Sequence, residues 1–189
     1  MAGGLIHKEV TYLPCADADS ERRLLAEAKS GQPAALGALY AHHRASVYDF
    51  AFTLTGNHDD AEDVRQMTFV RAFLGLRNFR GECAFRTWLF RICLNTARSW
   101  RKRQHPNKPC HQPDLLDPVV EAHRRLEAEE VRRRIAVLPR WARELIALCD
   151  LQGLRYHEAA ALLRCSAKAI GPRLHRARRL LKERLTDLL

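Results

Sequence analysis

The basic side chains near the C-terminal end have the spacing of a DNA-binding helix. The stretch CSAKAIGPRLHRARRLLKER, residues 165–184, repeats apolar residues at helical intervals. Those apolar positions are Ile170, Leu174, Ala177 and Leu181. The basic positions on the opposite face are Lys168, Arg173, Arg176 and Arg179. Such a helix can pack one face on a core while its cations meet phosphates and base edges in a major groove. The alternative is a solvated basic helix packed in a hairpin.

The residues before this stretch complete the pattern of a helix-turn-helix. The sequence YHEAAALL, residues 156–163, predicts a short helix with the small residue Ala160 where the two helices cross. A four-residue turn follows, and Ser166 can cap the second helix.

Gly171 and Pro172 lie where the second helix should run without interruption. A helix that began only at Pro172 would remove Ile170 from the apolar face. We therefore expect the helix to begin near Ala167 and to be kinked at the proline, which lacks the N–H for a bond to the carbonyl of residue 168.

Neither a metal site nor an enzymatic site is expected. His105, Cys110 and His111 are metal-ligand types, but their spacing matches no recognised site and the prolines between them limit how they could converge. The acidic residues within 59–63 are nearly consecutive, so their side chains point in several directions. The sequence contains no recognisable nucleophile-and-base arrangement and no phosphate-binding loop. We predict no catalytic residue, no cofactor and no bound metal.

The net charge favours a polyanionic partner. The 189 residues carry 32 Lys and Arg against 22 Asp and Glu, a formal net charge of +10 at pH 7. The surplus is clustered in residues 77–103 and 166–189. No run of about eighteen apolar residues occurs, and the first ten residues lack the apolar core of a secretory signal. We expect a cytoplasmic protein that binds nucleic acid and does not insert into a membrane.

The periodicity of apolar residues is helical almost throughout, so the fold class is all-α. We expect two small helical domains joined by a Pro-rich flexible linker, with a helix-turn-helix in the C-terminal domain. The expected segments are an N-terminal extension (1–19), an N-terminal domain (20–103), the linker (104–118) and a C-terminal domain (119–189). In the helix expected at about 83–103, Trp88 and Trp100 fall on the buried stripe.

Three blocks of sequence carry a resemblance to a known family. They are DAEDVRQMTFVRAF (60–73), FRGECAFRTWLFRICLNTARSWRKR (79–103), and LPRWARELIALCDLQGLRYHEAAALLRCS leading into RLHRAR (138–178). Their order and their spacing around the Pro-rich linker resemble the extracytoplasmic-function sigma factors, the smallest promoter-recognition subunits of bacterial RNA polymerase.

The first block, by this resemblance, lies on the helix that docks on the clamp of the largest polymerase subunit. The residues implied in docking are Asp60, Glu62, Asp63, Gln66 and Arg71. Met67 departs from the family pattern, which usually has an acidic residue there.

The second block is implied to bind the downstream (minus-ten) promoter element as a single strand. A loop from Phe79 to Phe85 could hold an extruded base between apolar walls, while arginines follow the backbone and Asn95 bonds a base edge. The implied DNA-binding residues here are Phe79, Arg80, Phe85, Arg86, Arg91, Asn95, Arg98 and Arg101.

The third block is implied to bind the upstream (minus-thirty-five) element as a duplex. The residues implied are Ser166, Lys168, Arg173, His175, Arg176 and Arg179. Arg164 occupies the turn position where the family has glycine or a short polar residue, so strain or a different turn is expected. Family members are usually held inactive by an anti-sigma factor, which makes core RNA polymerase, promoter DNA and an anti-sigma factor the expected partners. The alternative function is a stand-alone helix-turn-helix repressor.

Overall fold

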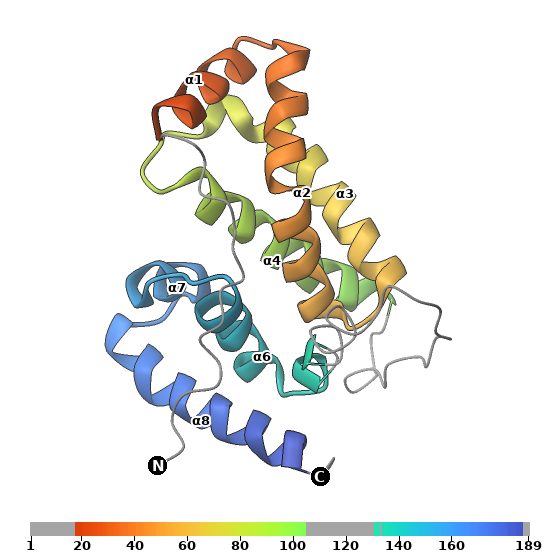
Figure 1. Ribbon diagram of the computed structural model, residues 1–189, viewed down its shortest axis with the longest axis vertical. Helices are drawn as coiled ribbons and strands as arrows, with labels where there is room; N and C mark the ends of the chain where they lie inside the picture. The colour runs from red at the N-terminus through yellow and green to blue at the C-terminus, as the bar shows by residue number, and fades with distance from the viewer. Residues whose placement is uncertain (1–17, 105–130, 133, 187–189) are drawn as a thin grey trace. The chain divides into compact units, whose positions relative to one another are not determined.

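The regular elements of this chain are helices. The computed structural model describes residues 18–104, 131–132 and 134–186, and within them every regular element is helical (Figure 1), which confirms the all-α class. The elements are α1 (Ala18–Lys29), α2 (Pro33–Thr55), α3 (His58–Gly75), a 3₁₀ turn (Leu76–Asn78), α4 (Phe85–Gln104), α6 (Arg140–Ile146), a π-helical turn (Ala147–Leu151), α7 (Tyr156–Leu163) and α8 (Ala167–Thr186). No helix in these residues is long and apolar enough to cross a membrane.

The chain divides into two compact units, residues 1–42 and 43–189. The described part of the first unit holds α1 and the start of α2, separated by a tight turn. Gly31 has a φ of 90° in this turn, and its N–H donates to the carbonyl of Ala28 at 3.0 Å. This left-handed conformation suits glycine, which has no Cβ to clash with the backbone. The turn therefore ends α1.

In the second unit, an apolar core forms where the rest of α2 meets α3 and α4. Phe50 of α2 and Phe90 of α4 are fully buried, with ring centroids 5.0 Å apart. The side chain of Asn57 caps α3 by accepting the N–H of Asp60 at 3.0 Å. Acidic residues in the first turn of α3 also favour its start, because the N-terminal end of a helix dipole is positive.

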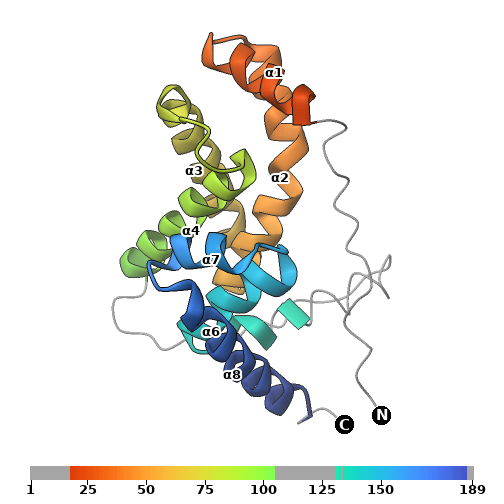
Figure 2. The same ribbon diagram turned by 90° about the vertical axis from the view of Figure 1, so that its left-hand side faces the viewer.

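The C-terminal helices form the expected helix-turn-helix, and Figure 2 shows α6, α7 and α8 grouped together. The helix α8 begins at Ala167 and continues through Pro172, so the longer helix is confirmed, while the kink stays a prediction. Ile170, Leu174 and Ala177 are buried as predicted, and Leu181 is half-buried.

The turn between α7 and α8 contains the backbone strain that the sequence predicts. Arg164 adopts φ 54° and ψ 50°, the left-handed region, and its N–H donates to the carbonyl of Ala160. It is the only non-glycine residue with positive φ among those the structure describes. A side chain in this conformation costs about 1–2 kcal/mol.

Candidate nucleic-acid interface

The loop before α4 does not present open apolar walls in this structure. Phe79 is 6% exposed and Phe85 is 1% exposed. Their ring centroids are 5.6 Å apart, and both pack on the half-buried Trp88, at 5.1 Å and 5.6 Å respectively. The two phenylalanines close the core because burial of a large apolar ring is worth more than its exposure at a loop. On the outside of the same loop, Arg80 is exposed and lies 3.9 Å from Glu82.

The outer face of α4 presents polar side chains at intervals of about one turn. Arg91 and Asn95 are exposed one turn apart, and Arg101 is half-buried further along the helix. A face of this kind can follow a phosphate backbone and offer one amide to a base edge. The second tryptophan of α4, Trp100, is half-buried, and its Nε1 donates to Oδ1 of Asp60 at 2.9 Å.

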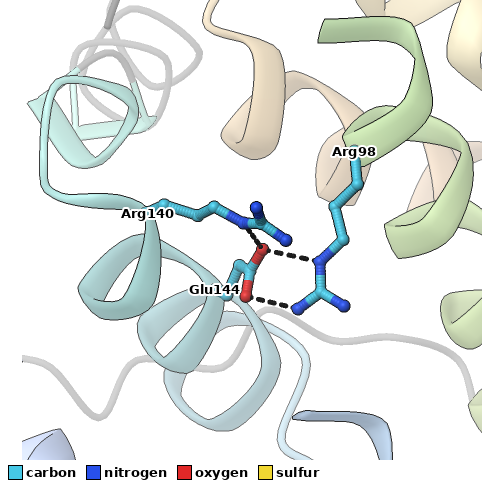
Figure 3. A network of polar contacts seen from close by, with 3 residues as sticks. All are labelled: Arg98, Arg140 and Glu144. Atoms are coloured by element: carbon cyan, nitrogen blue, oxygen red, sulfur yellow. Dashed lines mark hydrogen bonds and ion pairs between the residues drawn. The ribbon is translucent and has the colours of Figure 1, made fainter. Parts of the chain in front are cut away.

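Two other arginines of α4 bond residues of the C-terminal part of the chain, and Figure 3 shows one of them, Arg98, with Glu144 and Arg140. Arg98 donates from Nε and Nη2 to Oε1 and Oε2 of Glu144 in α6, at 2.9 Å and 2.7 Å. Arg140 donates from Nε to the same Oε1 at 2.8 Å. Near the start of α4, Arg86 donates to Oε1 of Gln152 at 2.9 Å. Two residues that the sequence assigns to DNA, Arg86 and Arg98, therefore already bond side chains of this chain.

Glu144 is ionised in spite of its burial. Its side chain is only 8% exposed, and this burial raises the pKa of the carboxyl group. The hydrogen bonds from Arg98 and Arg140 lower the pKa by more, so the pKa lies below its ordinary value. The carboxylate thus remains charged at neutral pH and holds both guanidinium groups.

The outer face of α8 is basic, as the sequence predicts. The exposed members of the predicted set are Lys168, Arg173, His175, Arg176 and Arg179, and Ser166 lies exposed just before the helix. The guanidinium of Arg176 lies 5.5 Å from the centre of the Trp141 ring, a cation–π contact that orients it. Arg179 lies 3.7 Å from Glu183.

A further arginine of α8, Arg178, was not assigned from the sequence. It donates from Nε and Nη2 to both carboxylate oxygens of Asp150, at 3.0 Å and 2.5 Å, and this hydrogen bonding raises its pKa. Asp150 lies in the π-helical turn after α6. The ion pair therefore fixes α8 against that turn and takes no part in the predicted DNA-binding face.

On α3, four of the five predicted docking residues bond within the fold. Asp60 accepts from Trp100, and Glu62 pairs with Arg65 and also accepts from Gln66 Nε2 at 3.1 Å. The hydrogen bonds from Gln66 and Arg65 outweigh the effect of burial and lower the pKa of Glu62. Arg71 donates to Oγ1 of Thr96 of α4 at 2.9 Å.

The exposed surface of α3 also contains two apolar residues that the sequence analysis missed. Val70 is 58% exposed and Leu74 is 80% exposed, and with Asp63 and Gln66 they repeat at three and four positions. That spacing places all four on one face of the helix. The i, i+4 apolar pair is visible in the sequence, but residue type alone does not show whether such a pair is buried or exposed.

No cluster of three or more His, Cys, Asp or Glu side chains that could hold a metal ion occurs within the described ranges. His105, Cys110 and His111 lie outside them. Nothing in the described part of the chain therefore tests the prediction made for these three residues.

Comparison with known proteins places both halves of the chain in one family. Residues 39–106 match the family described as Sigma-70 region 2, and residues 128–181 match Sigma-70, region 4. The chain is 32% identical over 145 residues to the ECF RNA polymerase sigma-E factor of Salmonella typhimurium, covering 69% of this chain and 76% of that protein. It is 27% identical to the RNA polymerase sigma-H factor of Pseudomonas aeruginosa, covering 90% and 96%.

Solved structures agree with these relatives. CnrH, in complex with the cytosolic domain of CnrY, is 35% identical with a TM-score of 0.69, covering 89% of this chain and 99% of that one. The sigma factor RpoE of Bartonella quintana, in complex with the anti-sigma factor NepR, is 26% identical with a TM-score of 0.66, covering 79% and 96%. The sequence relatives and the shared fold together show that this chain belongs to the extracytoplasmic-function sigma factors of the sigma-70 family.

Proposed function

We propose that this chain is an initiation factor that binds core RNA polymerase and directs it to a subset of promoters. The observation that carries the proposal is the pairing of two exposed basic helix faces, on α4 and on α8, with the region 2 and region 4 matches. Its mechanism is binding rather than catalysis, and it acts in the cytoplasm, where the polymerase works.

The two basic faces divide the promoter between them. By function we divide the chain into residues 20–103 for the polymerase clamp and the minus-ten element, residues 104–118 as the linker, and residues 119–189 for the minus-thirty-five element. On α4, Arg91 and Asn95 are exposed and ready for a single strand. On α8, Arg173 and Arg176 flank the exposed His175 and face a duplex. Arg86 and Arg98 bind DNA only after they leave Gln152 and Glu144.

The docking face that we propose on α3 extends beyond the five residues implied by the resemblance. Asp63 and Gln66 remain in it because both are exposed. Val70 and Leu74 extend it with apolar surface, and a helix with this mixture suits a groove that is part basic and part apolar. Asp60 and Glu62 support the helix from within the fold.

An anti-sigma factor is the expected regulator. CnrH is known in complex with the cytosolic domain of CnrY, and the Bartonella RpoE in complex with the anti-sigma factor NepR. We propose that a comparable protein holds this chain inactive until a stress signal releases it.

The test is a pull-down with core RNA polymerase followed by run-off transcription on promoter templates. Asn95→Ala should impair opening of the promoter while polymerase binding stays intact, and Asp63→Lys should weaken polymerase binding. A chain that fails to bind polymerase, but binds duplex DNA tightly and specifically as a free dimer, would instead be a repressor.

A further inference from the structure

A basic pocket of about 790 Å³ lies among α2, α4, α6 and α8. Its cationic lining residues are Arg98, Arg101, Lys102, Arg140, Arg143 and Arg184. The single carboxylate in the lining is Glu144, which is already held by Arg98 and Arg140. The pocket therefore has a large surplus of positive charge.

Only part of this charge is balanced within the described part of the chain. Arg101, Lys102 and Arg184 form no ion pair with any residue that the structure describes. Arg143 is only 3% exposed, and its Nη1 donates to the carbonyl of Ala136 at 2.5 Å. Like charges gathered around a partly enclosed space repel one another, so an anion that entered would lower the electrostatic energy of the site.

The remaining lining is apolar. Leu54, Leu94 and Ala97 contribute from α2 and α4, and Leu138 and Pro139 from the residues before α6. A volume of about 790 Å³ lies within the range typical of small-molecule sites, about 300–1,000 Å³, and such sites usually combine apolar walls with a few polar groups. The site thus suits a ligand that has one apolar ring system and a dense group of negative charges.

We propose that this pocket binds a nucleoside polyphosphate. The phosphates would meet the guanidinium and ammonium groups, which bind phosphate oxygens strongly, and the base would lie on the apolar lining. An acidic peptide fits less well, because its carboxylates are spread along a chain whereas a polyphosphate concentrates its charge in a small volume. Since the lining cations come from α4, α6 and α8, an occupied pocket would also hold these helices together and keep Arg98 on Glu144.

The experiment is isothermal titration of the full chain, without polymerase, at low salt. The probes are GTP, inorganic triphosphate and guanosine. We expect saturable binding of one GTP per chain, weaker binding of triphosphate and no binding of guanosine. Equal affinity for GTP and triphosphate would show that the apolar lining is unused, and absence of saturable GTP binding would show that the pocket takes no nucleotide; either result overturns the proposal.

Charge reversals locate the site. Lys102 and Arg184 are exposed, so Lys102→Glu and Arg184→Glu should leave folding intact and weaken GTP binding by about tenfold or more. Arg91→Glu is the matched control, because Arg91 is exposed on α4 but does not line the pocket, and it should leave GTP affinity within about twofold.

An equal loss in all three variants would mean attraction to overall charge alone and would refute the site. So would full displacement of GTP by a short DNA duplex whose own binding needs Lys102 and Arg184, since the pocket would then belong to DNA. These measurements need no transcription, so they stand or fall separately from the role in initiation.

Discussion

Arg98 and Glu144 lie 46 residues apart in the chain and form a two-bond ion pair between α4 and α6, with N–O distances of 2.9 Å and 2.7 Å. A carboxylate in this position occupies the same two donors that a DNA phosphate would use. In this structure Glu144 thus occupies an arginine that the sequence assigns to DNA.

Glu144→Gln should release Arg98 and open this contact. The amide has one acceptor oxygen where the carboxylate has two, and its NH2 group cannot accept from a guanidinium, so we expect the free energy of unfolding to fall by about 1–3 kcal/mol. The affinity of the free protein for a single-stranded DNA oligonucleotide should rise because Arg98 no longer has to leave Glu144 before it binds. Each ~1.4 kcal/mol that breaking this pair costs in the wild type corresponds to about a tenfold gain in affinity. Urea unfolding and fluorescence anisotropy measure the two effects.

Glu183→Gln is the matched control, because Glu183 lies in an exposed pair with Arg179 on α8 and should change stability by less than about 0.5 kcal/mol. If Glu144→Gln bound single-stranded DNA no better than this control, Arg98 would not be limited by Glu144.

The same pair should make stability depend on pH in acid. The folded pKa of Glu144 lies below its ordinary value of 4.5, so its contribution is complete above that value and is lost as pH falls through the folded pKa. The difference in unfolding free energy between the wild type and Glu144→Gln should be constant from pH 7 to about 5 and should shrink below about 4. Urea unfolding at each pH checks this, and a difference that grew in acid would reverse the assigned sign.

Arg164→Gly should stabilise the chain. Arg164 has φ 54°, a conformation in which glycine has no steric cost. A glycine loses more conformational entropy on folding, but the relief of strain is larger. We therefore expect the free energy of unfolding to rise by about 1 kcal/mol. Lys168→Gly is the control, because Lys168 lies on the exposed face of α8 in helical conformation, and this change should lower the free energy of unfolding by about 1 kcal/mol. Differential scanning calorimetry shows whether each variant is more or less stable than the wild type. A loss of stability in both variants would mean that Arg164 is unstrained.

Pro172→Ser should raise stability and alter preference at the upstream element. The proline stands inside α8 and removes one backbone donor, at a cost of up to about 3 kcal/mol that is smaller near the N-terminal end of a helix. Serine restores the donor and adds a hydroxyl on the exposed face. Thermal melting and transcription from a library of minus-thirty-five sequences test the two effects, and an unchanged melting temperature and profile would show that the proline fits without strain.

Leu74→Ser should weaken polymerase binding by about tenfold without a loss of stability. The side chain is 80% exposed, so the folded chain gains little from it, whereas a partner groove would bury it. Val131→Ser, another exposed apolar position, should leave polymerase affinity unchanged. Surface plasmon resonance against immobilised core enzyme compares them, and equal affinities would remove Leu74 from the docking face.

Features set by local geometry could be predicted from the sequence. The start of α8 at Ala167, the burial of Ile170 and Leu174 and the positive φ of Arg164 all follow from helical period and turn sterics within a few residues. The cap of α3 by Asn57 is also local, but an asparagine at that position fits the end of the preceding helix as well as the start of α3.

Features that depend on distant partners could not be predicted. Periodicity shows that Arg98 faces outward, but nothing in its neighbourhood indicates Glu144 as its partner. Phe79 and Phe85 are buried because they form a three-ring cluster with Trp88. The sequence shows only that aromatic residues lie at a loop, where they could be either exposed or buried. The exposure of Val70 and Leu74 likewise depends on which face of α3 packs against the core.

The π-helical turn at Ala147–Leu151 positions two side chains that bond other helices. Such a turn holds one more residue than an α-helical turn, as if a single residue had been inserted into a helix. Asp150 within it reaches Arg178 of α8, and Gln152 just after it reaches Arg86 of α4. Removing that extra residue would return the turn to α-helical spacing and change where Asp150 lies within it. The extra residue thus links the path of the backbone to the contacts that this segment makes with α8 and with α4.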